Sequence, residues 1–142
     1  MKIEEINIML AEDSKIDESA LDAESLKISY LHGKWYAIYM TEARVLRTVH
    51  NELKALRRTK TEYYLGKATD EVYLANPLHL KVLRSDLDTY LDSDPEVILL
   101  DERVNTQKLK CEMLESFIKS LNSRGFNIKS AIDFLRFKNG VN

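Results

Sequence analysis

The amino-acid sequence predicts a mainly α-helical protein with one long central helix and packed C-terminal helices. Good helix formers are plentiful, whereas the 142 residues include only four Gly and two Pro. Apolar residues recur at helical spacing over most of the chain, which is the pattern of amphipathic helices. At this length we expect a single domain, residues 1–142, that is long enough to bury a core.

The N-terminal half is predicted to contain a short helix followed by a very long one. The short helix covers roughly Lys2–Ala11 and has a narrow apolar stripe. The long helix follows the candidate N-cap Asp17 and ends near Gly66, which suits the position just after a helix. Its later apolar residues follow steps of three and four, as in a heptad seam: Leu46, Val49, Leu53 and Leu56.

The middle of the chain is less regular. Lys67–Pro77 has little periodicity and is interpreted as a connector. A helix is expected over roughly Leu78–Leu91, where Leu residues recur at helical spacing, and Asp92–Pro95 should break it. The short apolar run Val97–Leu100 fits either a strand or a helical turn, and periodicity does not decide between them.

Two further helices are predicted for the C-terminal part. The first begins near Asn105 and ends at Gly125, with Phe126 placed for the apolar contact of a Schellman cap. The second is capped by Asn127 and stops at Gly140. The C-terminal half is therefore expected to consist of several packed helices.

Charge is distributed in blocks along a chain whose net charge is only −2. The stretch Leu53–Lys67, LKALRRTKTEYYLGK, combines five bases with one acid and a tandem tyrosine, whereas elsewhere acids mostly balance or outnumber bases. Because the whole chain is slightly acidic, this cluster is a local feature, and a polyanion is its obvious partner.

Helical geometry divides this cluster into two faces. Arg47, Lys54, Arg57 and Arg58 fall on the side opposite the apolar seam, where a row of bases can approach successive phosphates. Lys60 instead continues the seam, so its side chain must snorkel or the seam must end there.

The tandem tyrosine can be interpreted in two ways. Tyr63 and Tyr64 could stack on unpaired bases at the end of the helix, as in single-strand binders. Alternatively, they anchor the helix end in the core, and the bases are solvated or face an acidic protein.

Catalysis finds little support in the sequence. The three histidines are far apart, and the chain lacks a Gly-rich phosphate loop, a G-x-S-x-G motif and an H-E-x-x-H motif. The single Cys111 is interpreted as a small buried hydrophobe. We therefore expect no enzyme activity, no cofactor and no metal site. Without an apolar stretch of about 20 residues or a basic N-terminus, the protein is expected to be soluble and intracellular.

The stretch LKALRRTKTEYYLGK resembles the UvsY family of phage recombination mediators, which carries a leucine, alternating bases and a Tyr-Tyr pair there. A second block, Lys119–Gly140, is similar to the C-terminal segment of that family, especially at Ser123 to Phe126. Lys34-Trp35 also has its likeness in the same order, so the resemblance runs from about Asp17 to Gly140.

The resemblance implies a ring-shaped homo-oligomer, a hexamer or heptamer, that binds single-stranded DNA and has no catalytic activity. Its partners would be the phage recombinase and the phage single-strand binding protein, because such mediators help load the recombinase onto strands covered by that protein. The implied location is the host cytoplasm. The DNA-contacting pair would be Arg58 and Lys60, where family members can present Lys and then Arg.

Residues 1–67 are accordingly expected to form the DNA-binding part and residues 78–142 the oligomerisation part. The candidate DNA-binding residues are Arg47, Lys54, Arg57, Arg58, Lys60, Tyr63, Tyr64 and Lys67. The candidate oligomerisation residues form a broad apolar arc: Leu109, Met113, Leu114, Phe117, Ile118 and Leu121. For this arc, packing within one subunit is the alternative. For the whole protein, the alternative is a helical oligomeric scaffold or interaction module that does not bind DNA.

Overall fold

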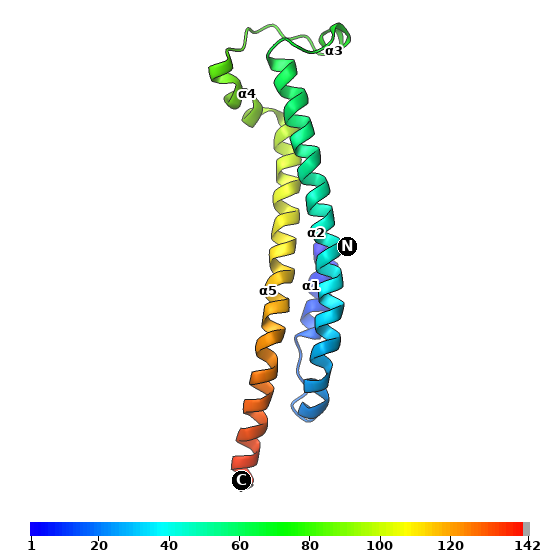
Figure 1. Cartoon of the computed structure of the whole chain (residues 1–142), viewed down its shortest axis with the longest axis vertical. Coiled ribbons are helices and arrows are strands. Elements are labelled where there is room, and N and C mark those ends of the chain that lie inside the picture. Colours follow the sequence, from blue (N-terminus) through cyan, green and yellow to red (C-terminus); the bar gives the residue numbers. More distant parts are fainter. Residues whose placement is uncertain (141–142) are drawn as a thin grey trace. The chain divides into compact units, whose positions relative to one another are not determined.

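The computed structural model describes residues 1–140, and all regular structure within that range is helical (Figure 1). The elements are α1 (Ile3–Asp13), α2 (Leu21–Tyr64), α3 (Asp70–Ala75), the 3-10 turn η1 (Arg84–Asp86), α4 (Leu87–Ser93) and α5 (Pro95–Lys138). The predicted fold class, a mainly α protein with a long central helix packed against C-terminal helical structure, is confirmed. None of the helices in the described range is long and apolar enough to cross a membrane.

The chain divides into two compact units, to each of which both α2 and α5 contribute. Unit 1 comprises Met1–Ala43 and Leu109–Asn142, and unit 2 comprises Arg44–Lys108.

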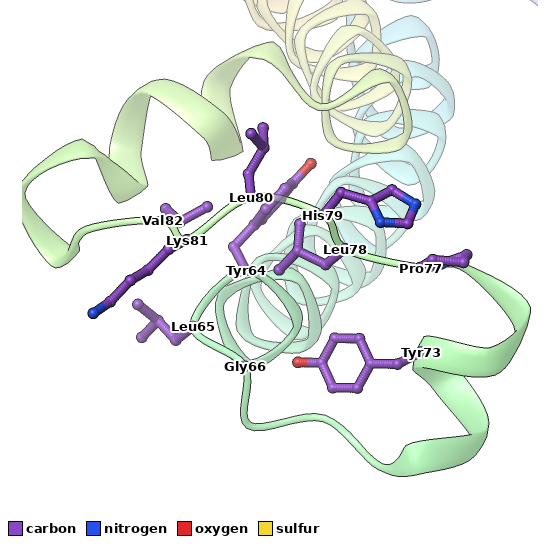
Figure 2. Close-up of a pocket in the computed structure, with 10 residues that line it drawn as sticks. All are labelled: Tyr64, Leu65, Gly66, Tyr73, Pro77, Leu78, His79, Leu80, Lys81 and Val82. Carbon is purple, nitrogen blue, oxygen red and sulfur yellow. The ribbon is translucent and has the colours of Figure 1, made fainter.

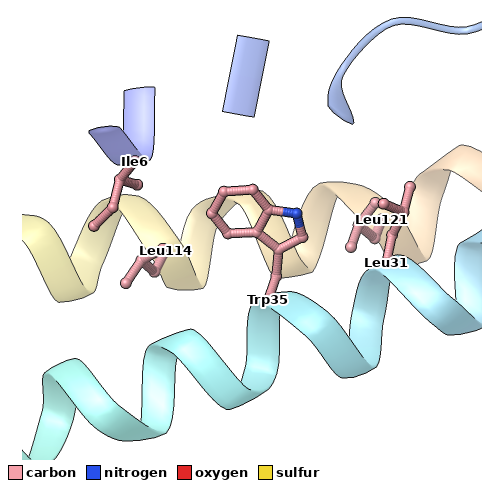
Figure 3. Close-up of a cluster of buried hydrophobic side chains, with 5 residues drawn as sticks. All are labelled: Ile6, Leu31, Trp35, Leu114 and Leu121. Carbon is pink, nitrogen blue, oxygen red and sulfur yellow. The ribbon is translucent and has the colours of Figure 1, made fainter. Parts of the chain in front are cut away.

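Unit 1 is organised around Trp35, which is completely buried. Figure 3 shows its indole among Ile6 of α1, Leu31 of α2, and Leu114 and Leu121 of α5. The indole N–H donates to Asp13 Oδ2 over 2.8 Å, which satisfies the only polar atom of this side chain. Three helices therefore share one apolar core in this unit.

Polar contacts close the edge of the same core. Lys34 Nζ lies 2.6 Å from Asp13 Oδ2, and Arg124 donates from Nη2 to the main-chain oxygen of Asp13 over 2.8 Å. Burial raises the pKa of Asp13, but the hydrogen bonds from Lys34 and Trp35 outweigh it and hold the pKa below its ordinary value. Because Asp13 is the last residue of α1, these contacts fix that helix to its neighbours.

Unit 2 is held together by an apolar seam between α2 and α5. Val49 and Leu53 of α2 pack against Val97 and Val104 of α5, and all four are buried. The flanking residues of the seam are Leu46, Leu56 and Leu100. The predicted heptad seam of the long helix is thus confirmed as a packing surface, and the opposite face of α2 in this unit is left to solvent.

The C-terminus of α2 is a Schellman cap. Gly66 has a φ of +76°, a left-handed conformation that glycine adopts without steric cost. The Gly66 N–H donates to the main-chain oxygen of Tyr63 over 3.2 Å, and the Lys67 N–H donates to the main-chain oxygen of Glu62 over 2.8 Å. The prediction that the long helix ends at Gly66 is confirmed. At the other end, Asp17 caps the turn before α2, where it accepts the Ser19 N–H, and the helix itself begins at Leu21.

The predicted helix over Leu78–Leu91 is wrong. Residues 77–83 have no regular structure, and only η1 and α4 follow. Leu78 and Val82 instead lie beside Tyr64 and Leu65 at the end of α2, where they help to line a cavity of about 580 Å³ (Figure 2). Packing against the end of α2 overrides the local helical spacing, and Leu80, on which the helix prediction relied, is exposed. The predicted connector also contains the short helix α3.

The predicted helix start near Asn105, the helix end at Gly125 and the cap at Asn127 are wrong as well, because α5 runs without interruption from Pro95 to Lys138. Val97–Leu100 is helical, which decides between the two alternatives for that run. A glycine inside a helix costs about 1 kcal/mol relative to alanine. Here the buried residues on either side of Gly125 outweigh that cost, because they continue one face with a seven-residue period: Leu114, Leu121 and Ile128. Phe126, expected to cover a helix end, is exposed instead.

Candidate nucleic-acid interface

The exposed face of α2 in unit 2 carries a row of basic side chains. At about 100° per residue, the row falls within an arc of about 80° opposite the apolar seam. Its members, which we call the basic row, are Arg44, Arg47, Lys54 and Arg58, all of them exposed. From first to last residue the basic row covers about 21 Å of helix, at 1.5 Å per residue.

Most of the basic row is free of counter-ions. Among residues 1–140, Arg44, Arg47 and Lys54 make no ion pair. Arg58 lies 3.4 Å from Glu62 Oε1, but its side chain is 83% exposed, and such an i,i+4 pair contributes little. A solvent anion can therefore approach all four cations.

Arg57 and Lys67 lie at the margin of this surface. Arg57 is half-buried and lies 3.3 Å from Asp92 Oδ1 in α4, so part of its charge is used within unit 2. Lys67 is exposed just beyond the Schellman cap at the end of α2. Both could add to the positive surface without belonging to the basic row.

Lys60 has a different environment from its neighbours. Its side chain is only 19% exposed, and Nζ lies 3.3 Å from Asp94 Oδ2 and 3.5 Å from Glu96 Oε2. Lys60 therefore follows the seam and brings its ammonium to the first turn of α5, as expected of a snorkelling lysine. Because α2 is regular as far as Tyr64, Arg58 and Lys60 face different neighbours.

Asp94 is the centre of this arrangement and is almost completely buried, with 4% of its surface exposed. Its Oδ1 accepts the N–H groups of Glu96 (2.9 Å) and Val97 (3.2 Å), so it caps the N-terminus of α5. Its Oδ2 accepts the Tyr64 hydroxyl over 2.7 Å. Burial raises the pKa of Asp94, but the hydrogen bonds from Tyr64, Val97 and Lys60 outweigh it and lower the pKa.

The two tyrosines at the end of α2 are engaged in contacts within unit 2. Tyr63 stacks on Tyr73 with ring centroids 5.5 Å apart, and its hydroxyl donates to the main-chain oxygen of Asn76 over 3.1 Å. Tyr64 packs on Tyr90 at 5.6 Å, and burial together with the bond to Asp94 raises its pKa to about 12. This geometry favours the interpretation that the tyrosines anchor the helix end, and stacking on bases stays a prediction.

Most of the predicted oligomerisation residues lie in the core of unit 1. Leu114 and Leu121 are fully buried, and Met113, Phe117 and Ile118 pack against the same core. Leu109, in contrast, is 63% exposed. Five of the six residues thus pack within one subunit, and a role of these residues in oligomerisation stays a prediction.

Sequence reasoning missed two sets of residues. Arg44 completes the basic row and could have been found from its spacing, three positions before Arg47, although it lies outside the basic stretch Leu53–Lys67. On α5, the exposed aromatic residues are Phe126, Phe134 and Phe137. They do not share the face of α5 that carries the buried Leu114, Leu121 and Ile128. Apolar residues outside the buried face are the sequence signal by which they could have been found. No group of three or more side chains suited to a metal ion occurs in the described part of the chain.

Comparison with known proteins is consistent across sequence and structure. The family described as "Recombination, repair and ssDNA binding protein UvsY" matches residues 9–141. The recombination protein uvsY of Enterobacteria phage T4 is 21% identical over 140 residues, which cover 99% of each chain.

Crystal structures of the bacteriophage T4 recombination mediator protein UvsY have a similar fold. Lattice type II superimposes with a TM-score of 0.87 at 21% identity and covers 98% of each chain. Lattice type I gives a TM-score of 0.84 at 21% identity and covers 94% of this chain and 98% of that one. Since the family match extends over nearly the whole sequence, the chain belongs to the UvsY family.

Proposed function

We propose that this protein binds single-stranded DNA through the basic row on α2 and acts as a recombination mediator. The observation that carries this proposal is the set of four exposed cations, three of them without an ion pair among residues 1–140, on one face of a regular helix. Lys and Arg side chains that neutralise phosphates release counterions from the nucleic acid. This release supplies most of the free energy of non-specific binding between a protein and DNA. Contacts of this kind position a strand without reading its bases.

In its finer form, the proposal includes the phage recombinase and the phage single-strand binding protein as partners. The protein would promote loading of the recombinase onto strands covered by the binding protein, in the host cytoplasm and without catalysing a reaction. Membership of the UvsY family supports this role.

We also propose that the protein assembles into a homo-oligomeric ring of six or seven subunits. Exposed apolar side chains on α5 support self-association, because large apolar surfaces are usually covered in solution. The most exposed of them in unit 1 are Leu109, Phe126, Phe134 and Phe137. A ring would link several weak DNA sites and raise avidity by orders of magnitude without any additional interaction at each site.

The test of DNA binding is a salt titration with a double variant. Lys54→Ala with Arg58→Ala should weaken binding to oligo-dT, measured by fluorescence anisotropy. The slope of log K against log salt should become shallower by about 0.7 for each phosphate that the variant no longer neutralises. Lys108→Ala removes an exposed lysine of α5 in the same unit and serves as the matched control.

Unchanged affinity and slope in a folded double variant would refute DNA binding through this face. The basic row would then fit the alternative function, a helical scaffold that binds acidic proteins.

A further inference from the structure

We propose that the outer face of α2 in unit 1, the side turned away from Trp35, is the surface on which a second copy of this chain docks. The docking element is the outer face of α5 of that second copy. This inference rests on the proposed ring, which it deepens by assigning the receiving surface and the direction of assembly.

The outer face of α2 in unit 1 carries a stripe of apolar and small residues. At about 100° per residue, the stripe falls within an arc of about 80° on the side of the helix opposite Leu31 and Trp35. Its members, which we call the outer stripe, follow steps of four and three: Leu26, Tyr30, Gly33, Ala37 and Met40. All five are exposed, Leu26 by 82% and Tyr30 by 70%. Such steps are the pattern by which one helix packs on another.

The outer stripe does not have the composition of a solvated helix face. Exposed helix faces usually carry charged and polar side chains. None of the five residues of the outer stripe is charged, and no acid occurs between Glu24 and Glu42 in a chain with 23 acids. Both of these glutamates are themselves buried. The outer stripe therefore resembles a packing surface that has no partner within the subunit.

Gly33 has no structural reason within the subunit. Glycine is among the least favourable residues in a helix interior, and a methyl group added at Gly33 would meet no atom within 4 Å. Gly125 differs, because a methyl group there would lie 3.7 Å from Ile28 Cδ1. Together with the small Ala37, Gly33 leaves room on the outer stripe for the close approach of a side chain from another molecule.

The outer face of α5 offers large side chains that suit this space. Its exposed apolar residues in unit 1 lie opposite the buried Leu114 and Leu121, and each is at least 63% exposed: Leu109, Phe126, Phe134 and Phe137. Large side chains on one surface and Gly with Ala on the other are complementary, as knobs are to holes. Two outer stripes packed on each other would instead set Gly33 near its own copy and leave the holes unfilled. The occupant is therefore α5 of the second copy.

The two outer faces determine the direction of assembly. Each lies opposite the core that α2 and α5 share, so one copy offers a receiving face on one side of unit 1 and a docking face on the other. Such a head-to-tail contact closes into a ring when its rotation closes. The three exposed phenylalanines alone represent roughly 400 Å² of apolar surface. That is about half of the roughly 800 Å² that each partner buries in an interface of standard size.

The mass of the full chain in solution, measured by light scattering, tests the receiving face. Gly33→Leu fills the hole and should lower the mass to that of a monomer, at a concentration at which the unmodified protein is a ring. The subunit itself should become more resistant to urea, because Leu is a much better helix former than Gly and meets no other atom. Ser25→Leu adds the same side chain at an exposed position about 100° from the centre of the outer stripe. This matched control should keep the mass of the unmodified protein.

Cross-linking of mixed subunits tests the docking element and the direction. Leu26→Cys and Phe126→Cys each place one exposed thiol on one of the two faces, whereas Cys111 is buried. Cyclic symmetry places equivalent residues of all copies at the same height along the axis. Leu26 and Phe126 lie at a similar height, because Ile28 is beside Gly125 within one subunit. A short bismaleimide should therefore cross-link the two co-expressed variants into dimers and leave each variant alone as a monomer on a denaturing gel.

Each outcome discriminates. A ring that persists in Gly33→Leu would overturn docking on the outer stripe. Cross-links in Leu26→Cys alone would show that α2 pairs with α2 and would overturn the direction, and a mixture without cross-links would overturn α5 as the docking element. If the unmodified protein is monomeric at every concentration, the proposed ring itself fails. That result differs from failure of this inference alone, in which the ring persists.

Discussion

Replacement of Asp94 by alanine should destabilise the protein by about 3 kcal/mol, because this one carboxylate serves three separate contacts. Loss of the cap on α5 costs about 1 kcal/mol. The hydroxyl of Tyr64, left without its acceptor in a half-buried position, costs about 1 to 2 kcal/mol. Loss of the ion pair with Lys60 adds less than about 1 kcal/mol to the destabilisation, since the Lys60 ammonium can still reach Glu96 and water.

The measurement is urea unfolding followed by circular dichroism at 222 nm. All variants are compared at one protein concentration, because the proposed self-association would add to the apparent stability. Asp94→Asn is the matched control. Its one amide oxygen can still accept the N–H groups of the cap, and its amide nitrogen can donate to the Tyr64 hydroxyl oxygen in place of the lost acceptor. Because only the charge that faces Lys60 is lost outright, its effect should be clearly smaller. If Asp94→Ala changes the free energy of unfolding by less than about 0.5 kcal/mol, the size of an ordinary surface substitution, the reasoning is refuted.

The carboxylate of Asp94 should also make the stability of the protein depend on pH. The pKa of Asp94 in the folded protein lies below its ordinary value of 3.8, because hydrogen bonds from Tyr64, Val97 and Lys60 outweigh the effect of burial. A depressed pKa stabilises the folded state above the unfolded-state pKa, and this stabilisation is lost as pH falls through the folded-state pKa. The difference in stability between the unmodified protein and Asp94→Asn should therefore shrink as pH drops below about 3.8.

Three other predictions concern separate features. Burial and the hydrogen bond to Asp94 raise the pKa of Tyr64 to about 12 from 10.0, so the stabilisation by its hydroxyl should be lost as pH rises through that interval. The check is urea unfolding of Tyr64→Phe and the unmodified protein across the interval. A difference in the free energy of unfolding that does not vary with pH would contradict the prediction. Gly66→Ala should cost about 1 to 2 kcal/mol through left-handed backbone strain alone, since no atom lies within 4 Å of the added methyl group; a melting temperature equal to that of the unmodified protein would contradict it. Leu121→Ala should cost about 2 to 5 kcal/mol as a buried truncation, and Leu109→Ala should cost clearly less because its side chain is exposed within the subunit. Equal effects in urea unfolding would contradict the assignment of Leu121 to the core.

The sequence correctly predicted those elements whose structure depends on a few neighbouring residues. The seam residues of α2 recur at heptad spacing, and Gly66 supplies the left-handed conformation that its cap requires, so both could be inferred from a few neighbouring residues. The fold class followed from the same patterns. These features need no knowledge of distant contacts.

The errors lie where distant contacts decide. The helical spacing of Leu80 and Leu83 suggested a helix, but Leu78 and Val82 pack at the end of α2 and leave Leu80 exposed. Gly125 was interpreted as a helix end, although buried residues on both sides continue one face of α5. Propensity is a weak prior when packing of this kind opposes it.

The candidate site shows the same division. The basic face could be predicted from spacing along one helix, and so could the entry of Lys60 into the seam. The partner of Lys60 could not, because Asp94 lies at the start of a different helix and the intervening segment has little periodicity. Which of the two nearby bases, Arg58 or Lys60, is exposed to solvent therefore depends on a contact that no local pattern specifies.

The contact between Tyr64 and Asp94, which are 30 residues apart, should also affect the rate of folding. It closes a loop, and closing 30 flexible residues costs roughly 3 kcal/mol in chain entropy beyond a constant. Because this cost grows only with the logarithm of length, doubling the loop would add about 0.6 kcal/mol, so insertions between α3 and α4 should be well tolerated. The cost must nevertheless be met before Val49 can pair with Val104, so closure of this loop is expected to set the folding rate of unit 2.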